Sequence, residues 1–451
     1  MIKMTLAEVA DTLALTTQNR DTTFTGISID TRTLAPGNLF AAIKGERVDG
    51  HDLVEEARIK GAAAALVMRP VAAALPQLTT GDIVAALGKL GAAWRNQFDI
   101  PIVAVTGSNG KTTTKNMLAG IMKAACQGNE EEVLATKGTL NNHYGLPLTL
   151  AGLSNKHRYA AIEMGMNHFN EIKYLTEITQ PRVAIITNAA AAHLEGVGDL
   201  AGVARAKAEI FLGLPDDGIA ILNRDDAFYD YWCEQIGNHQ HLSFGFHPDA
   251  DVSAILHTTS DAYQKLMVKT PSGTIDINLP LLGKHNAANA LAAAAACLAI
   301  GVDLTAIKAG LESIAPAPGR LLMHTLENGV KIIDDTYNAN PYSLEAAVAT
   351  LASFAGKKIL VLGDMAELGS ETKTIHHQVG TDIRSAGIDY LFTYGELSSN
   401  AAHAFGEGAY HFNELEKLVS ALKPFLYNTT TILVKGSRSM KMEQVLTGLM
   451  G

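Results

Sequence analysis

Short apolar runs alternate with longer helical patterns through the middle of this chain. Four runs rich in valine, isoleucine and alanine cover residues 102–106, 159–162, 183–187 and 219–222, and a glycine, an asparagine or a polar turn follows each of them. Strands of this length, separated by helical segments, are typical of βαβ units, which build a mostly parallel sheet. A helix is predicted just ahead of the first run, over residues 83–98.

The same alternation returns on a smaller scale after a proline-rich seam at residues 315–319. Four further apolar runs lie at residues 331–334, 358–362, 390–393 and 431–434, with helical segments between them. This rhythm predicts a second doubly wound sheet of the Rossmann-like type.

The first part of the chain has a different pattern, with short β-like segments at residues 26–30, 39–43 and 64–67. An alanine-rich stretch interrupted by prolines, residues 71–80, leads out of it and is typical of a linker. We therefore predict an α/β protein of three domains. These are a small N-terminal α/β domain (1–82), a central domain with a mostly parallel sheet and helices (83–314), and a C-terminal Rossmann-like α/β domain (315–451).

Composition narrows the class of protein. The chain has 451 residues and a formal net charge of −10, which argues against a nucleic-acid partner, although a local cationic cleft could still hold phosphates. Its three cysteines lie far apart, as expected in a reducing compartment. Residues 1–20 lack the pattern of a secretory signal, and the most apolar stretch, 287–300, is too short to span a bilayer. We expect a cytoplasmic monomer without stable membrane insertion.

The strongest local signal is a glycine-rich loop between a predicted strand and a predicted helix. Glycines let backbone N–H groups turn inward around an anion, and the helix that follows adds the positive end of its dipole. Lys111 would neutralise the β- and γ-phosphates of ATP, and the Thr112 hydroxyl would bind Mg²⁺. Val105 stands where the longer form of this motif has glycine, so the match is to the shorter Gly-x-x-Gly-Lys-Thr form. The alternative is a glycine turn without a ligand. The predicted nucleotide-binding residues of this central P-loop-type domain are Gly107, Ser108, Asn109, Gly110, Lys111, Thr112 and Thr113.

Three further polar residues are candidates for the same site. Glu163 ends the predicted strand at 159–162, where an acid is well placed to bind Mg²⁺, although a solvated carboxylate would fit as well. His193 follows the strand at 183–187, and Lys207 lies in a helical segment. Taken alone, His193 would be interpreted as a structural histidine and Lys207 as a surface lysine.

Together these residues resemble the Mur ligase family of peptidoglycan amino-acid ligases. The resemblance rests on the sequence from Thr106 to Thr113, on the strand ending at Glu163, on Ala-His-Leu-Glu at 192–195 and on Ala-Lys-Ala-Glu-Ile at 206–210. At positions 190–191 this chain has Ala-Ala where the family usually has Gly-Pro. The resemblance implies an ATP-dependent carbon–nitrogen ligase that activates a carboxylate as an acyl phosphate.

The resemblance also implies the metal and catalytic residues. Thr112 and Glu163 would hold one Mg²⁺, and His193 would help to hold a second. Lys207 would be carbamylated by CO₂ and become a further metal ligand, because an unmodified ammonium cannot bind a hard cation. The catalytic residues that it implies are Lys111, His193, Lys207 and Arg320.

The third region resembles the members of the family that add D-alanyl-D-alanine to a UDP-MurNAc-tripeptide. The matching segments are 333–341 and 362–369, together with His376 and residues 435–438. The third residue of the tripeptide, diaminopimelate or lysine, is left open. Contacts to ATP are implied for Asn286, Asn289, Arg320, Asp335 and Tyr337. Without the resemblance, Asn286 and Asn289 would be a helix cap and a polar helix position. Contacts to the two other substrates are assigned to Ser28, Asp30, Arg32, Asp49, His51, Asn141, Asn142, Asn338 and Asn340.

Two other functions remain as alternatives. A ligase of the same build could add a single amino acid, or glutamate to a folate. A regulatory P-loop NTPase, which couples hydrolysis to partner binding, would turn over ATP without any carboxylate substrate. The second alternative would leave the nucleotide-sugar-like and dipeptide-site motifs without a role.

Overall fold

A nine-stranded sheet occupies the middle of the computed structural model, which describes residues 1–190, 194–259 and 263–450. The strand order is β15-β14-β13-β12-β11-β10-β7-β9-β8. Pairing is parallel from β8 to β13 and antiparallel from β13 to β15. The strands are β7 (Ile102–Thr106), β8 (Val133–Ala135), β9 (Tyr159–Glu163), β10 (Val183–Ile186), β11 (Ile219–Asn223), β12 (Gln240–Gly245), β13 (Val252–Thr259), β14 (Gln264–Thr270) and β15 (Gly273–Leu279).

Helices cover both faces of this sheet because its strands alternate their side chains between two apolar cores. In β7, Val103 and Val105 pack on one core, with α4 (Lys111–Ala125), α10 (Lys284–Ala299) and α11 (Leu304–Glu312). Ile102 and Ala104 pack on the opposite core. The helices on that side include α3 (Ile83–Arg95), α5 (Gly145–Leu150), α6 (Glu171–Thr179), α8 (Leu200–Ala208) and α9 (Tyr229–Gln235). A short helix, α7 (Leu194–Val197), precedes α8.

The N-terminal part of the chain contains two small sheets. Strands β1 (Lys3–Thr5) and β2 (Thr23–Thr25) pair antiparallel. Strands β3 (Ile27–Ser28), β4 (Leu39–Ala41), β5 (Ala64–Val67) and β6 (Gln77–Thr79) form a parallel sheet in that order, accompanied by α1 (Leu6–Leu13) and α2 (Val54–Ile59). The apolar core of this part continues through α3 into the central sheet without a break.

The third region forms a six-stranded sheet in the order β16-β17-β21-β18-β19-β20, with β16 alone antiparallel. Its strands are β16 (Leu322–Thr325), β17 (Lys331–Asp335), β18 (Lys357–Gly363), β19 (Tyr390–Tyr394), β20 (Ala409–Phe412) and β21 (Thr430–Lys435). Its helices are α12 (Pro341–Ala352), α13 (Thr372–Ser385), α14 (Ser399–Phe405), α15 (Leu415–Leu422) and α16 (Glu443–Met450). Two apolar cores, one on each face, hold this region together.

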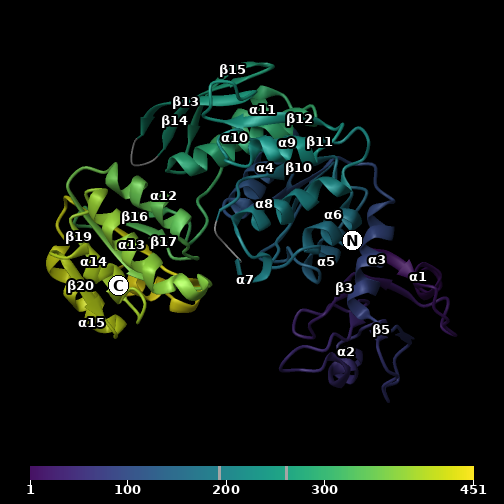
Figure 1. Cartoon of the computed structure of the whole chain (residues 1–451). Coiled ribbons are helices and arrows are strands. Elements are labelled where there is room, and N and C mark those ends of the chain that lie inside the picture. The colour runs from purple at the N-terminus through teal and green to yellow at the C-terminus, as the bar shows by residue number, and fades with distance from the viewer. Residues whose placement is uncertain (191–193, 260–262, 451) are drawn as a thin grey trace.

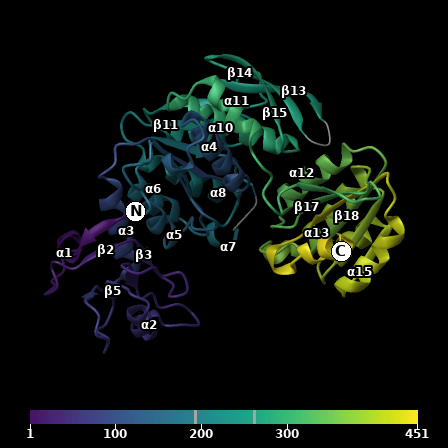
Figure 2. The ribbon, with the colours of Figure 1, turned by 180° about the vertical axis from the view of Figure 1, so that it is seen from behind.

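The chain forms an arch, with the central region between the N-terminal and C-terminal ones (Figures 1 and 2). The predicted α/β class, the mostly parallel central sheet and the second, Rossmann-like sheet are confirmed. Among the described residues, no helix is both long and apolar enough to cross a membrane.

Candidate active site

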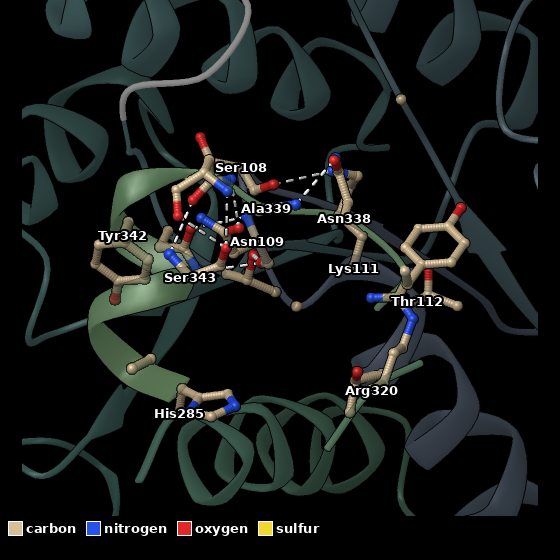
Figure 3. Close-up of a pocket in the computed structure, with 18 of the residues that line it drawn as sticks. Ser108, Asn109, Lys111, Thr112, His285, Arg320, Asn338, Ala339, Tyr342 and Ser343 are labelled. Carbon is tan, nitrogen blue, oxygen red and sulfur yellow. Dashed lines mark hydrogen bonds between the residues drawn. The ribbon is translucent and has the colours of Figure 1, made fainter. Parts of the chain in front are cut away.

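A cavity of about 720 Å³ lies where the carboxyl ends of the central strands face the third region. Many of the residues singled out in the sequence line it. These are Ser108, Asn109, Gly110, Lys111, Thr112, Thr113, Asn141, Asn142, Glu163, Asn286, Asn289, Arg320, Asp335, Tyr337, Asn338 and Asn340. Residues far apart in the sequence therefore meet around one space, with Ser108, Asn109, Lys111 and Thr112 of the phosphate loop (residues 107–113) along its rim (Figure 3).

The phosphate loop has its shape because of its two glycines. Gly110 has φ +83°, a backbone conformation that disfavours other residues, and a Cβ there would collide with the Asn289 side chain. A Cβ on Gly107 would collide with the Thr187 side chain. The loop therefore packs directly against the end of β10 and against α10.

The segment after β10 fixes the two residues between these glycines. Ser108 Oγ donates to the carbonyl oxygen of Ala190 and accepts from the Ala190 N–H, both at 2.9 Å. The backbone N–H of Asn109 donates to Asn188 Oδ1 at 3.0 Å, and Thr187 Oγ1 donates to the Asn109 carbonyl at 2.6 Å. The Ser108 side chain thus holds the loop in place.

Helix α4 starts at Lys111, so the N–H groups of its first turn have no partner within the helix. They form an anion-binding end next to the cavity. Lys111 Nζ donates to the carbonyl oxygens of Gly107 at 2.7 Å and Ser108 at 3.3 Å, which leaves the third ammonium donor for a phosphate. Burial lowers the pKa of Lys111, and nearby Glu163 opposes that shift.

Glu163 ends β9 and is 2% exposed. Asn141 Nδ2 donates to Glu163 Oε1 at 2.8 Å, whereas Glu163 Oε2 is buried without a hydrogen-bond partner. A buried carboxylate oxygen without a donor is costly unless a cation occupies the space beside it. Glu163 therefore fits a Mg²⁺ site, and Asn141 orients its carboxylate.

Replacing Asn141 with alanine is expected to lower the affinity for Mg²⁺ about 10- to 100-fold, because the partner that orients the metal ligand Glu163 is lost. Titration of ATP-dependent phosphate release with Mg²⁺ measures this. Asn129→Ala provides the control, because the Asn129 side chain bonds locally, to the Glu131 N–H and to Glu132, and does not line the cavity. An unchanged Mg²⁺ requirement in Asn141→Ala would contradict the orienting role.

Lys207, on α8, is only 1% exposed, so it is not the surface residue that its helical segment alone suggested. Burial, together with the charge of Lys111, lowers its pKa well below the usual range. His193 lies outside the described residues. No group of three or more histidine, cysteine or acidic side chains converges on a metal position in the part of the chain that the structure describes. The predicted ligands Thr112 and Lys207 are not of those types.

The third region contributes a guanidinium to the phosphate loop. The Arg320 side chain lies over the Tyr337 ring, 4.1 Å from its centroid, and its Nη2 donates to Thr112 Oγ1 at 3.4 Å. In Figure 3, Arg320 and Thr112 point toward one another, on the side of the cavity away from Tyr342. A cation from the third region is therefore already directed at the predicted phosphate position.

A second contact joins the two regions through the turn after β17. Asn340 Nδ2 donates to Asn109 Oδ1 at 3.0 Å, while Asn340 Oδ1 caps α12 by accepting from the Ser343 N–H. Lys435 Nζ donates to Asp335 Oδ2 at 2.6 Å and to the Asn338 carbonyl at 2.8 Å. Asp335 is therefore neutralised by a buried lysine.

Asn286 and Asn289, for which the family resemblance implied contacts to ATP, lie near the start of α10. Asn286 Nδ2 donates to the Leu282 carbonyl at 2.7 Å, and both Asn286 and Asn289 line the cavity. His285 also lines it and was not selected from the sequence. Burial is the main reason that its pKa falls to about 4, and Lys435 adds to the effect while Asp335 opposes it.

The five N-terminal candidates lie outside this cavity. Arg32 pairs with Asp30 at 2.7 Å, and Ser28 Oγ donates to the Asp30 carbonyl. His51 Nδ1 lies 2.6 Å from Asp49 Oδ1, and its Nε2 accepts from the Met68 N–H at 2.9 Å. Both ring nitrogens of His51 are occupied within the protein, so this side chain orders the segment between β4 and β5.

Two buried residues next to the phosphate loop were not selected from the sequence. Lys115, one helical turn after Lys111, is 7% exposed, and burial lowers its pKa, opposed by the charge of Glu163. Asn188 holds the phosphate loop through its side chain. A buried lysine one turn beyond the loop could have been anticipated from helix periodicity, since it shares a face with Lys111.

Comparison with known families decides the class of protein. Residues 105–297 match the Mur ligase middle domain, residues 319–438 match the Mur ligase glutamate ligase domain, and residues 23–125 match the Mur ligase family catalytic domain. The chain belongs to the Mur ligase family. The expected resemblance is thereby confirmed.

Similar Mur ligases are known over the whole length of the chain. The UDP-N-acetylmuramoyl-tripeptide–D-alanyl-D-alanine ligase of Escherichia coli (strain K12) is 45% identical, with coverage of 100% of this chain and 99% of that one. The crystal structure of MurF from Acinetobacter baumannii superposes with a TM-score of 0.93 at 36% identity, covering 100% and 99% of the two chains. MurF from Thermotoga maritima, solved in complex with ADP, gives a TM-score of 0.83 at 27% identity and covers 94% and 97%.

Proposed function

We propose that this enzyme joins D-alanyl-D-alanine to a UDP-MurNAc-tripeptide, using ATP, to give the UDP-MurNAc-pentapeptide precursor of peptidoglycan. The observation that carries the proposal is full-length similarity to enzymes of that name, one of which is 45% identical. The cavity supports it, because a phosphate-binding loop faces the third region across a space of about 720 Å³. ATP becomes ADP and phosphate in the reaction.

In the first step, the terminal carboxylate of the tripeptide attacks the γ-phosphorus of ATP in line, ADP leaves, and an acyl phosphate forms on the tripeptide. Lys111 and the first turn of α4 bind the phosphates, and Arg320 reaches them from the third region. These groups stabilise the charge of the transferring phosphoryl group and position it against the carboxylate.

Thr112 and Glu163 are the proposed Mg²⁺ ligands, with His193 at a second metal. Bound Mg²⁺ would neutralise charge on the β- and γ-phosphates. Two features support Glu163 in this role: its Oε2 is buried without a hydrogen bond, and Asn141 fixes its other oxygen.

We also propose that Lys207 carries a carbamate derived from CO₂. Carbamate formation needs a neutral amine, and burial next to Lys111 lowers the pKa of Lys207 in the direction that supplies one. The carbamate would give this buried position an anionic, oxygen-bearing group that suits Mg²⁺ and offsets the charge of Lys111.

In the second step, the amine of D-alanyl-D-alanine attacks the acyl carbonyl, and the tetrahedral intermediate expels phosphate. We assign residues 1–82 to the UDP-sugar moiety, 83–314 to ATP and 315–451 to the dipeptide. Ser28, Asp30, Arg32 and Asp49 are the proposed N-terminal contacts. Approach of the third region would exclude water from the acyl phosphate. The bacterial cytoplasm, which holds ATP and nucleotide sugars, is the proposed location.

Phosphate release in the presence of ATP, Mg²⁺ and UDP-MurNAc-tripeptide, with and without D-alanyl-D-alanine, tests the proposal. We expect release to depend on both substrates and the product to gain one dipeptide in mass. Turnover with a single amino acid in place of the dipeptide would favour another ligase of this build. Turnover indifferent to both substrates would point to a regulatory NTPase.

A further inference from the structure

The segment that leads from the central region into the third region carries Arg320, the cation that reaches the phosphate loop. Arg320 follows Gly319, at the end of the proline-rich seam, and precedes Leu321, which lies in one apolar core of the third region. The Arg320 side chain lies over the Tyr337 ring and extends toward Thr112 (Figure 3). The backbone on either side of Arg320 therefore sets the direction in which this side chain leaves the chain.

Two residues of this segment have left-handed backbone conformations. Gly319 has φ +74°, and a Cβ there would lie 2.9 Å from the backbone nitrogen of Tyr337, so the chain passes directly against Tyr337. Leu321 has φ +54°, which residues other than glycine seldom adopt, and its side chain is buried. Such a conformation persists where the surrounding structure imposes it.

A buried carboxylate holds this segment against the end of β17. The Gly319 N–H donates to Asp334 Oδ2 at 2.8 Å, and the Tyr337 N–H donates to the Gly319 carbonyl at 3.1 Å. Asp334 Oδ1 accepts from the Thr336 N–H at 3.1 Å and from the Thr336 hydroxyl at 2.6 Å. Asp334 is 6% exposed, and hydrogen bonds to a carboxylate shielded from water are strong. Gly319 is thus bonded on both sides to the stretch of chain that carries Tyr337.

These bonds fix the point from which the Arg320 side chain starts. Because Gly319 is held against Tyr337, the guanidinium stays over the Tyr337 ring, from which its Nη2 reaches Thr112 Oγ1. A fixed backbone and a ring to stack on reduce the number of rotamers open to an arginine. We infer that Asp334 is a positioning residue for Arg320 in phosphoryl transfer. The inference rests on the proposed function, in which Arg320 stabilises the transferring phosphoryl group.

The neighbouring acid of β17 has different surroundings. Asp335 lines the cavity and accepts from Lys435 Nζ at 2.6 Å, whereas Asp334 does not line the cavity and is bonded to the seam. Successive side chains of a strand point to opposite sides, so these two acids face different parts of the third region. Asp334 therefore acts through the residues that it holds.

Asp334→Ala tests the inference, because it removes the acceptor of the Gly319 N–H. The measurement is single-turnover formation of ADP from ATP in the presence of UDP-MurNAc-tripeptide. We expect the rate to fall about 10- to 100-fold, as when a catalytic group is displaced by a distant change. Gly319→Ala disturbs the same contact from the other side, because its Cβ would press on Tyr337, and it should also lower the rate. It carries the test if Asp334→Ala does not fold.

The same changes in an Arg320→Ala background separate positioning from a general loss of structure. If Asp334 acts through Arg320, Asp334→Ala should alter the rate of the Arg320→Ala enzyme by less than about twofold, because the group that it positions is already absent. Gly319→Ala should show the same dependence on Arg320. Equal fold losses with and without Arg320 would overturn the inference, and so would an unchanged rate in both single variants.

Thr336→Val is the matched control. It removes the hydroxyl bond to Asp334 Oδ1 but leaves the bond between the Gly319 N–H and Asp334 Oδ2, and Thr336 does not line the cavity. Its rate should stay close to that of the parent, and a loss as large as that of Asp334→Ala would count against the inference. A parent enzyme whose ADP formation does not depend on the tripeptide would refute the proposed function. A tripeptide-dependent parent with unaffected Asp334 and Gly319 variants would refute the inference alone.

Discussion

Replacing Lys111 with methionine is expected to lower ATP-dependent phosphate release about 10³-fold, because charge on the transferring phosphoryl group loses its nearest ammonium. Lys111 Nζ is held over the loop by the Gly107 and Ser108 carbonyls, so the charge is in place before the nucleotide arrives. The Lys111 ammonium group therefore does not have to be repositioned during the reaction. Phosphate release at saturating substrates measures the loss.

Lys123→Met on the same helix is the control for this prediction. Lys123 lies in the last turn of α4 and pairs with Glu130 at 2.8 Å, away from the cavity. Its replacement should leave turnover unchanged. The thermal unfolding temperature of Lys111→Met should stay close to that of the parent, since among the described residues Lys111 Nζ bonds to carbonyls of its own loop. Turnover within about tenfold of the parent would mean that the loop is not the phosphate site.

Replacing Arg320 with alanine is expected to reduce kcat about 10²- to 10³-fold, because the third region loses its contact with the transferring phosphoryl group. Arg320 already connects the third region to the phosphate loop, because its Nη2 donates to Thr112 Oγ1 at 3.4 Å. Arg320→Lys should recover little, since lysine keeps the charge but loses the planar fork and the stacking on Tyr337. Single-turnover formation of the acyl phosphate is the decisive measurement.

Arg384→Ala is the matched control for Arg320→Ala, at a position away from the cavity. The Arg384 guanidinium also lies over an aromatic ring, 5.1 Å from the Phe405 centroid, and does not line the cavity. A similar drop in both variants would indicate a loss of folding in the third region rather than a loss of charge at the phosphates. Full activity in Arg320→Ala would exclude it from the phosphoryl-transfer step.

Strands buried on both faces could be predicted from the sequence because they are continuous apolar runs. The prediction for β7 matches the structure residue for residue, and β9, β10 and β11 differ by one residue at an end. The hairpin strands β13 to β15 were missed. In β14 and β15, buried positions alternate with half-buried or exposed ones, many of them polar, so no apolar run marks these strands.

The site was predictable wherever one segment carries a complete chemical motif, as residues 107–113 do. The partnerships across segments were not predictable. Asn141 bonds to Glu163, and Asn340 bonds to Asn109, because different loops meet at the carboxyl edges of two sheets. That meeting depends on strand order and on the placement of the third region, which no local spacing encodes. The same reason kept Lys207 from being recognised as buried without the family pattern.

The distribution of apolar cores has a consequence for how this protein can evolve. The core beneath the N-terminal sheets continues into the central region, so that part cannot be exchanged for a foreign one without repacking α3. The two cores of the third region contain residues only from Leu321 onward, and the others end before it. Recombination at the proline-rich seam would therefore transplant the third region intact. Under the proposed assignment of the third region to the amine donor, selectivity for that donor could pass between lineages in a single genetic event. A change of the whole N-terminal part would instead need compensating changes in the core that it shares with the central region.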